Sequence, residues 1–135
     1  MDTTREAWQC GDPVLECGCG ADDLTRIRHA LAAAAKDAGL AGRALEDFVL
    51  AVNEVTTNAV VHGGGTGLLQ LWHCDGEIRC EVTDDGTGLD QEVLSSPRPP
   101  ASAVRGRGLW LAKQLCQVTV YPRAQGTTVR LAAAL

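Results

Sequence analysis

The spacing of apolar residues changes near the middle of this chain, at the three consecutive glycines Gly63 to Gly65. Before them, apolar residues recur every three or four positions, which is typical of one face of an α-helix. After them, apolar and polar residues alternate, as in a β-strand with one buried face. The sequence therefore predicts helices followed by strands that pack against them.

Two helices are predicted before the glycines. The first begins after Asp22 or Asp23, either of which is a suitable N-cap, and ends at Gly39. The second runs from about Ala44 to His62. The residues predicted to face the core are Leu24, Ile27, Leu31, Ala34 and Ala38 in the first helix, and Leu45, Phe48, Val52, Val55 and Ala59 in the second.

Asp75-Gly76 is a strong two-residue hairpin signal between two alternating segments. Alternation in the second segment places Glu77, Arg79, Glu81 and Thr83 on a face directed to water or to a partner. The predicted strands are Val14–Cys17, Leu68–Cys74, Glu77–Asp84, Gln117–Tyr121 and Thr127–Leu135, with a third helix at Leu109–Cys116 and a short turn of helix at 90–94. This order predicts a two-layer α/β sandwich.

The chain of 135 residues has the size of one domain, 1–135, and 45% of its residues are hydrophobic and 21% charged, as in soluble globular proteins. Its net charge of −5 argues against nucleic acid as the main partner, because phosphate binding needs a basic surface. There is neither an apolar run long enough to span a bilayer nor a secretion signal at the N-terminus. We expect no membrane association and a cytoplasmic location.

Six cysteines are more than expected, and three of them, Cys10, Cys17 and Cys19, lie close together near the N-terminus. They could hold a metal, form a disulfide or act as a thiol-based sensor. The alternative is that all six are reduced and behave as small apolar residues.

Polar side chains at Glu54, Asn58 and His62 are spaced four residues apart, on one face of the second predicted helix. A carboxylate and a carboxamide beside an apolar stripe are costly to bury unless something binds them. Glu54 could accept a proton, and Asn58 could bind Mg²⁺ through its oxygen. His62 is either a ligand contact or a C-terminal residue that interacts with the helix dipole.

Two glycine segments follow, DDGTG at Asp84 to Gly88 and GRGL at Gly106 to Leu109. Asp84 ends a predicted strand, where its carboxylate could accept a hydrogen bond from an exocyclic amine. At the start of a helix, GRGL could present backbone N–H groups to phosphate, with Arg105 and Arg107 adding charge. Taken separately, each segment could also be an ordinary turn or helix junction.

The ordered set E-x₃-N, D-x-G-x-G and G-x-G-L resembles the GHKL (Bergerat-fold) ATPase superfamily across nearly the whole chain. Within it, NEVTTNAVVHGG is most similar to the bacterial anti-sigma factor serine/threonine kinases, whose usual pattern is E-x₃-N-A-x₂-H-G. The resemblance implies an α/β (α+β) fold with a mostly antiparallel sheet covered by helices on one face. It also implies ATP and Mg²⁺ as cofactors.

The resemblance assigns a role to each motif. Glu54 would be the catalytic base, Asn58 the Mg²⁺ ligand and Asp84 the adenine-binding carboxylate, with a lid loop at about 89–105. The other implied ATP-binding residues are His62, Gly86, Gly88, Arg105, Gly106, Arg107, Gly108, Leu109, Thr127 and Thr128.

The implied function is that of an anti-sigma factor. Such a protein sequesters an RNA polymerase sigma factor and phosphorylates a competing anti-anti-sigma protein with a STAS domain, and it usually works as a homodimer. The alternative is a binding module that switches partners without catalysis, for which ATP is dispensable.

Overall fold

The structure is a computed structural model, and it describes residues 8–62, 67–84, 104–123 and 126–135. For residues 62 and 104–107 it describes the backbone only. The gaps contain Gly86, Gly88, the predicted helical turn at 90–94 and most of the predicted lid, so these lie outside the described residues.

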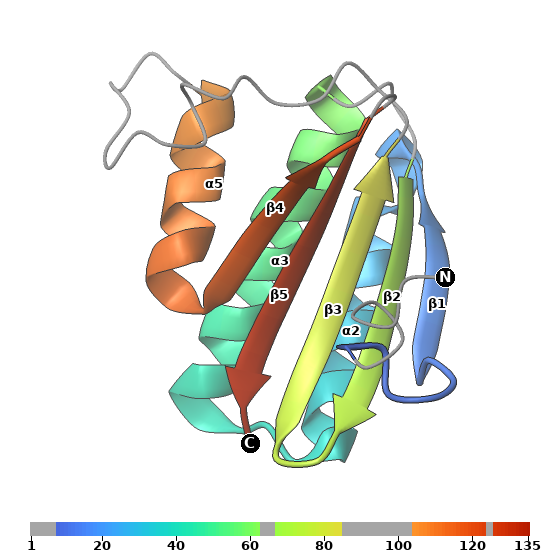
Figure 1. The fold of residues 1–135 in the computed structure, drawn as a ribbon, viewed down its shortest axis with the longest axis vertical. Helices are drawn as coiled ribbons and strands as arrows, with labels where there is room; N and C mark the ends of the chain where they lie inside the picture. The colour runs from blue at the N-terminus through green and yellow to red at the C-terminus, as the bar shows by residue number, and fades with distance from the viewer. Residues whose placement is uncertain (1–7, 63–66, 85–103, 124–125) are drawn as a thin grey trace.

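In the described part of the chain, five strands form one antiparallel sheet in the order β1-β2-β3-β5-β4. The strands are β1 (Leu15–Cys19), β2 (Gly67–Cys74), β3 (Glu77–Asp84), β4 (Gln117–Pro122) and β5 (Thr127–Ala134). Figure 1 shows β3 and β5 at the centre of the sheet, with β1 and β4 at its edges. The predicted hairpin at Asp75-Gly76 is confirmed, since Gly76 takes the positive φ of 79° that such a turn requires.

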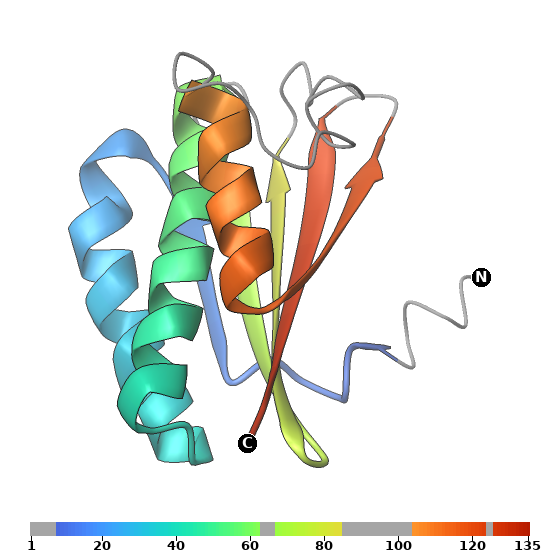
Figure 2. The same cartoon turned by 90° about the vertical axis from the view of Figure 1, so that its left-hand side faces the viewer.

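The three α-helices that the structure describes between residues 24 and 115 cover one face of this sheet (Figure 2). They are α2 (Leu24–Ala38), which follows the short 3-10 helix η1 (Ala21–Asp23), then α3 (Gly42–His62) and α5 (Val104–Leu115). The predicted end of α2 is confirmed: Gly39 caps it in the left-handed region, at φ 116°. The two-layer α/β sandwich with an antiparallel sheet is therefore confirmed.

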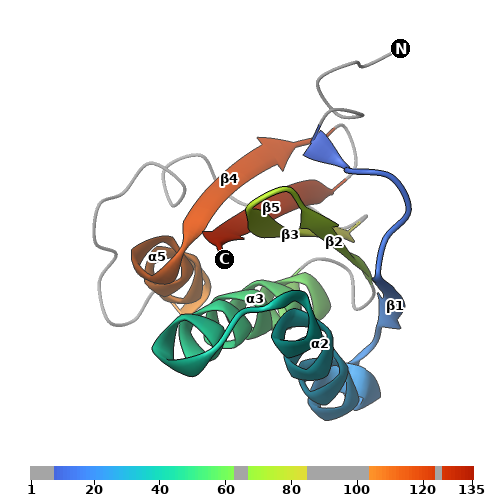
Figure 3. The ribbon, with the colours of Figure 1, turned by 90° about the horizontal axis from the view of Figure 1, so that it is seen from below.

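The core lies between the helices and the sheet, as the periodicity predicts. Phe48 and Val52 of α3 are fully buried against Leu71 and Ile78 of the sheet. Helix α3 packs against both other helices, so it occupies the middle of the helical layer (Figure 3). This position brings the polar residues of α3 next to α5.

Helix α5 begins five residues earlier than predicted, at Val104 and not at Leu109. The glycines of GRGL therefore lie within its first turns, and residues 104 and 105, which were assigned to the lid, are helical. The sequence signal was weak here because glycine disfavours helix, and contacts with α3 outweigh that preference.

The prediction that the outer face of β3 meets water or a separate partner is wrong at its centre. Glu81 is 1% exposed and forms an ion pair with Arg130 of β5, at 3.0 Å. The cover is part of the same chain: Trp8 and Gln9 lie on the side of the sheet away from the helices. Alternation within one strand could not reveal this cover, because the covering residues are some seventy positions away in the sequence.

The structure distinguishes between the alternatives that the sequence leaves open for the cysteines. Cys10 forms a disulfide with Cys74, whereas Cys17 and Cys19 are free thiols. Within the described ranges, no group of three or more His, Cys, Asp or Glu side chains could hold a metal ion. Of the alternatives for the N-terminal cysteines, the structure therefore supports a disulfide, at Cys10, and not a metal site.

Candidate functional site

One end of the sheet brings together two of the predicted adenine-binding residues. Asp84, the last residue of β3, pairs directly with Thr127, the first residue of β5. Each lies two residues from a core residue of the same strand, Val82 or Val129, and side chains two residues apart point to the same face. Both therefore lie on the face covered by the helices. They are nearly buried, with exposed fractions of 9% and 2%. A carboxylate and a hydroxyl therefore stand side by side at the boundary of the core.

The hydroxyl of Thr127 is the clearest sign of a ligand at this end of the sheet. Among the described residues, its Oγ1 is the one buried side-chain oxygen or nitrogen without a hydrogen-bond partner. A buried hydroxyl left unpaired costs about 1–3 kcal/mol, so such groups are rarely retained without a role. A purine ring carries ring nitrogens and an exocyclic amine, which are hydrogen-bonding groups that suit a hydroxyl such as that of Thr127 and a carboxylate such as that of Asp84.

Thr128 lies on the opposite face of the sheet. It pairs with Thr83 and Tyr121, away from the helices. The structure therefore brings Thr127 into the site and leaves Thr128 out of it.

Helix α3 supplies the second part of the site. Glu54 and Asn58 are one helical turn apart and half-buried, as the i, i+4 spacing predicts. Neighbouring threonines are bound to the helix itself: the hydroxyls of Thr56 and Thr57 both donate to the Asn53 carbonyl. Glu54 and Asn58 are thus the polar side chains of this stretch that face α5.

The contact between α3 and α5 centres on Gly108. A Cβ atom at this position would lie 2.9 Å from Oε2 of Glu54 and 3.6 Å from Oδ1 of Asn58. A real Cβ does not approach an oxygen that closely, so only glycine fits without displacing the carboxylate. The close approach brings the backbone of α5 to the carboxylate and carboxamide that the sequence singled out.

The backbone of Arg105, Gly106 and Arg107 lies in the first turn of α5, where peptide N–H groups have no partner within the helix. Such N–H groups, together with the helix dipole, favour phosphate. Leu109 is buried beneath this turn at 2% exposure. His62 is the last residue of α3, and its side chain lies outside the described part of the chain.

Arg123 is a site residue that sequence reasoning missed. It follows β4, and its Nη1 donates to the backbone carbonyl of Asp84, at 3.4 Å. It thereby brings a positive charge to the end of the sheet that carries Asp84 and Thr127. No local pattern marks it, because its relation to Asp84 depends on the antiparallel pairing of three strands.

The free cysteines do not supply a nucleophile. Burial, helped by the neighbouring Cys17 sulfur, raises the pKa of the Cys19 thiol to about 11, and burial likewise raises that of Cys116 to about 11. Burial also raises the pKa of Cys80 well above its usual value. At neutral pH these residues are thiols and not thiolates, as expected for packing residues.

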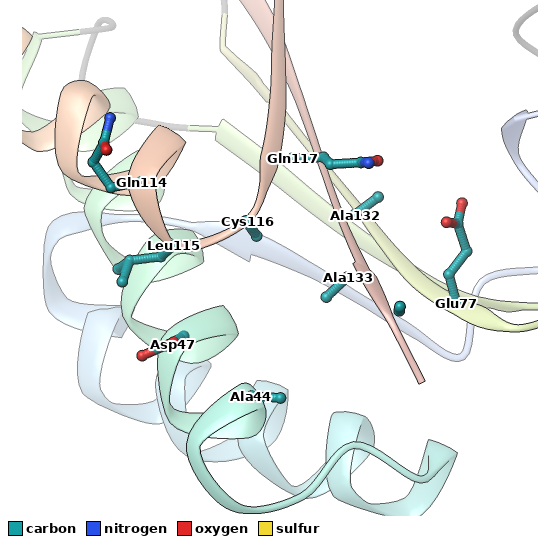
Figure 4. Close-up of a pocket in the computed structure, with 10 residues that line it drawn as sticks. Ala44, Asp47, Glu77, Gln114, Leu115, Cys116, Gln117, Ala132 and Ala133 are labelled. Carbon is teal, nitrogen blue, oxygen red and sulfur yellow. The ribbon is translucent and has the colours of Figure 1, made fainter.

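A cavity of about 410 Å³ lies elsewhere, between the first turns of α3, the end of α5 and strands β4 and β5 (Figure 4). Its lining is mixed: alanines, Leu115 and Cys116 alternate with the polar side chains of Asp47, Glu77, Gln114 and Gln117. It contains none of the predicted site residues, so the arrangement around Gly108 and Thr127 is the stronger candidate.

Comparison with known proteins identifies the family of this domain. The family model of the histidine kinase-like ATPase domain matches residues 20–133. Two anti-sigma F factors from Clostridium botulinum, of strains Eklund 17B and Alaska E43, are each 34% identical over 65 residues. The match covers 41% of this chain and 46% of each relative, so it spans less than half of their length.

Solved structures show the same fold. The RsbU and RsbW domains of Rv1364c from Mycobacterium tuberculosis match with a TM-score of 0.62 at 22% identity, covering 91% of this chain and 33% of that one. A histidine kinase domain from Erythrobacter litoralis matches with a TM-score of 0.56 at 23% identity, over 83% of this chain and 59% of that one. Among the described helices, none has the length and apolar character to cross a membrane. From the match over residues 20–133, this chain belongs to the histidine kinase-like ATPase domain family.

Proposed function

We propose that this chain is an ATP-dependent protein serine/threonine kinase that acts as an anti-sigma factor. The observation that carries the proposal is the close approach of Gly108 to Glu54 and Asn58, because it joins a candidate base, a candidate Mg²⁺ ligand and a helix N-terminus. Membership of an ATPase domain family supports ATP as the nucleotide. The two relatives named as anti-sigma F factors support the regulatory role.

The residues fit Mg-ATP in two groups. Asp84 and Thr127 would hold the base, because their carboxylate and unpaired hydroxyl match its amine and ring nitrogens. Asn58 would bind Mg²⁺ through Oδ1, and the first turn of α5 would bind phosphate oxygens. Gly86, Gly88, His62 and the side chains of Arg105 and Arg107 are proposed to complete the pocket, with Thr128 now excluded by its position on the other face.

Glu54 is proposed as the general base. Its carboxylate would accept the proton of an acceptor hydroxyl, while the α5 N-terminus stabilises negative charge on the phosphoryl oxygens. When bound, Mg-ATP supplies the phosphoryl group that is transferred. Because Gly108 carries no side chain, the backbone of α5 can lie close to the base without displacing it.

The proposed acceptor is a Ser or Thr of a STAS-domain anti-anti-sigma protein that competes with a sigma factor for this chain. Phosphorylation would add about −1.5 to −2 charge to that competitor at pH 7 and weaken its docking. The sigma factor would then be the favoured partner. We propose that the chain works as a homodimer, as is usual in the family that it resembles.

Replacing Glu54 tests whether its carboxylate is the general base. Glu54→Ala should lower the rate of phosphate transfer from ATP to a STAS-domain substrate by about 10²-fold or more, because a positioned general base accelerates proton transfer by that factor. Mg-ATP affinity should change little. The measurement is radiolabelled phosphate on the substrate, alongside calorimetric titration of the nucleotide.

Glu46→Ala is the matched control, since Glu46 is an exposed carboxylate on the same helix. Its transfer rate should equal that of the unmodified chain. If Glu54→Ala retained full transfer, Glu54 would not be the base. If the unmodified chain bound Mg-ATP and a sigma factor without any transfer, the non-catalytic binding module would be the correct function.

A further inference from the structure

Residues 8–11 lie across the outer face of the sheet, which is the face opposite the described helices (Figures 2 and 3). We call them the strap. Its anchor is the disulfide between Cys10 and Cys74, two residues 64 positions apart whose Cα atoms are 5.6 Å from each other. The strap is thus linked covalently to the end of β2, in addition to its chain connection to β1.

The strap contacts residues at the centre of the outer face. The Trp8 ring lies 4.7 Å from the Arg130 guanidinium and makes an edge contact with Trp72 at 5.8 Å. The Trp8 carbonyl accepts a hydrogen bond from Nη1 of Arg79, at 2.8 Å, and the Gln9 amide donates to Glu81 at 3.4 Å. As a result Trp72 and Glu81 are each 1% exposed, although neither faces the helices.

The two ends of the disulfide differ in exposure. Cys10 is exposed, whereas Cys74 is buried at 4%. The Nη1 atom of Arg79 is 3.4 Å from the Cys10 sulfur, and a guanidinium at that distance favours the thiolate form of a cysteine. An incoming thiolate can therefore reach the Cys10 sulfur from solvent, and the same residue is the reactive thiol once the bond is broken.

We propose that Cys10–Cys74 is a redox modification site that controls whether the strap stays on the sheet. A dithiol reductant attacks the Cys10 sulfur, the S–S bond breaks and Cys74 leaves as a thiolate that takes up a proton. The second thiol of the reductant then displaces Cys10 from the mixed disulfide. Two electrons and two protons pass to the cysteines, and the reductant becomes a disulfide. A disulfide oxidant reverses the exchange.

Apart from the bridge, the described contacts of the strap with the sheet are noncovalent. Arg79 and Trp72 donate hydrogen bonds to the carbonyls of Trp8 and Gly11, at 2.8 and 3.1 Å, and the Trp8 ring packs on Arg130. Trp8 and Gln9 are both half-exposed, and the Gln9 hydrogen bonds are long, at 3.4 and 3.5 Å. Without the bridge, the strap is a chain end beyond β1, and ordering a chain end opposes these contacts. Reduction then exposes Trp72, Glu81 and Arg130 to solvent.

The strap and the candidate nucleotide site lie on opposite faces of the sheet. Glu81 and Arg130 belong to the outer face, and Asp84 and Thr127 to the face covered by helices. The redox state should therefore change the exposure of the outer face and leave nucleotide affinity unchanged. The inference does not depend on the proposed kinase function.

The test uses the full chain carrying Trp110→Phe, so that Trp8 and Trp72 are its tryptophans. After mild oxidation with oxidised glutathione and removal of the reagent, alkylation in denaturant should detect four thiols, and after dithiothreitol six. Acrylamide quenching of tryptophan fluorescence should increase on reduction. Cys10→Ser should show the reduced value under both conditions, because it cannot form the bridge.

Cys17→Ser is the matched control, because Cys17 is a free thiol on β1. It should respond to oxidation and reduction as the parent does. Six thiols after oxidation would overturn the modification site. Equal quenching in the oxidised chain, the reduced chain and Cys10→Ser would show that the strap stays bound without the bridge, and would overturn its release.

Discussion

Thr127 and Thr128 are adjacent residues with the same side chain, yet they meet different surroundings. Strand parity directs Thr127 toward the helices beside Asp84 and directs Thr128 to the outer face beside Thr83. The sequence implied both as nucleotide contacts, because a motif alone does not fix the register of the last strand. Once the pairing with β3 is known, only Thr127 remains in the candidate site.

Replacing Thr127 should have opposite effects on the stability of the chain and on its affinity for nucleotide. Thr127→Val replaces a buried, unpaired hydroxyl with a methyl group, so the free energy of unfolding should rise by about 1 kcal/mol without nucleotide. Mg-ATP affinity should fall, because the hydroxyl is proposed to bind the base. Urea unfolding and calorimetric titration measure the two effects.

Thr128→Val is the neighbouring control, and it should leave nucleotide affinity unchanged. If Thr127→Val bound Mg-ATP as well as the unmodified chain, the unpaired hydroxyl would have no part in nucleotide binding. A decrease in stability of the Thr127 variant would instead indicate that this hydroxyl is hydrogen-bonded in the folded chain.

Among the helices and strands, regular periodicity in the sequence predicted the bounds of some elements closely. The helix that carries Glu54 and the hairpin at Asp75-Gly76 are close to their predicted bounds, because each is specified by residues near to it in the sequence. The start of α5 and the cover over β3 were not predictable in this way. Each depends on contacts with a distant segment, α3 in one case and residues 8–11 in the other.

The ion pair on the outer face of the sheet can be tested by mutation. Glu81 and Arg130 form a buried ion pair between β3 and β5, so removing one partner leaves an uncompensated charge. Arg130→Met should lower the free energy of unfolding by about 3–5 kcal/mol. The double variant Glu81→Met with Arg130→Met should lose much less than the sum of the two single changes.

Urea unfolding of the four proteins in this cycle measures the coupling between the two side chains. Additive losses would mean that the pair does not interact in solution. A double variant as unstable as the Arg130 variant alone would point to the packing of the arginine against Trp8 and Tyr121 as the dominant contribution.

At the scale of the whole molecule, the buried thiols predict how stability changes with pH. The pKa of Cys19 is raised from 9.0 to about 11, mainly by burial, and that of Cys116 is raised to the same value for the same reason. In the folded state these thiols hold their protons more tightly than in the unfolded state. Their stabilising contribution is therefore complete below pH 9 and is lost between pH 9 and about 11.

Thermal unfolding across that interval should show Tm falling as pH rises. Cys19→Ala should reduce the slope, because one of the shifted groups is gone, although its cavity lowers stability at every pH. An identical slope in the variant and the unmodified chain would contradict the assignment. The bridged Cys10 and Cys74 do not titrate, so the comparison is made on the oxidised chain.

If α3, α5, β3 and β5 together form a site for Mg-ATP, calorimetric titration of the folded chain will detect it. The unmodified chain and Gly18→Ala, whose added Cβ meets no described atom within 4 Å, should bind one Mg-ATP per chain with similar affinity. Gly108→Ala adds a Cβ 2.9 Å from Oε2 of Glu54 and 3.6 Å from Oδ1 of Asn58, so it fills the space between α3 and α5 where Mg²⁺ and phosphate are proposed to bind. It should bind Mg-ATP at least about tenfold more weakly while remaining folded. Absence of binding by the folded, unmodified chain, or equal affinity in Gly108→Ala, would rule out an Mg-ATP site between these elements.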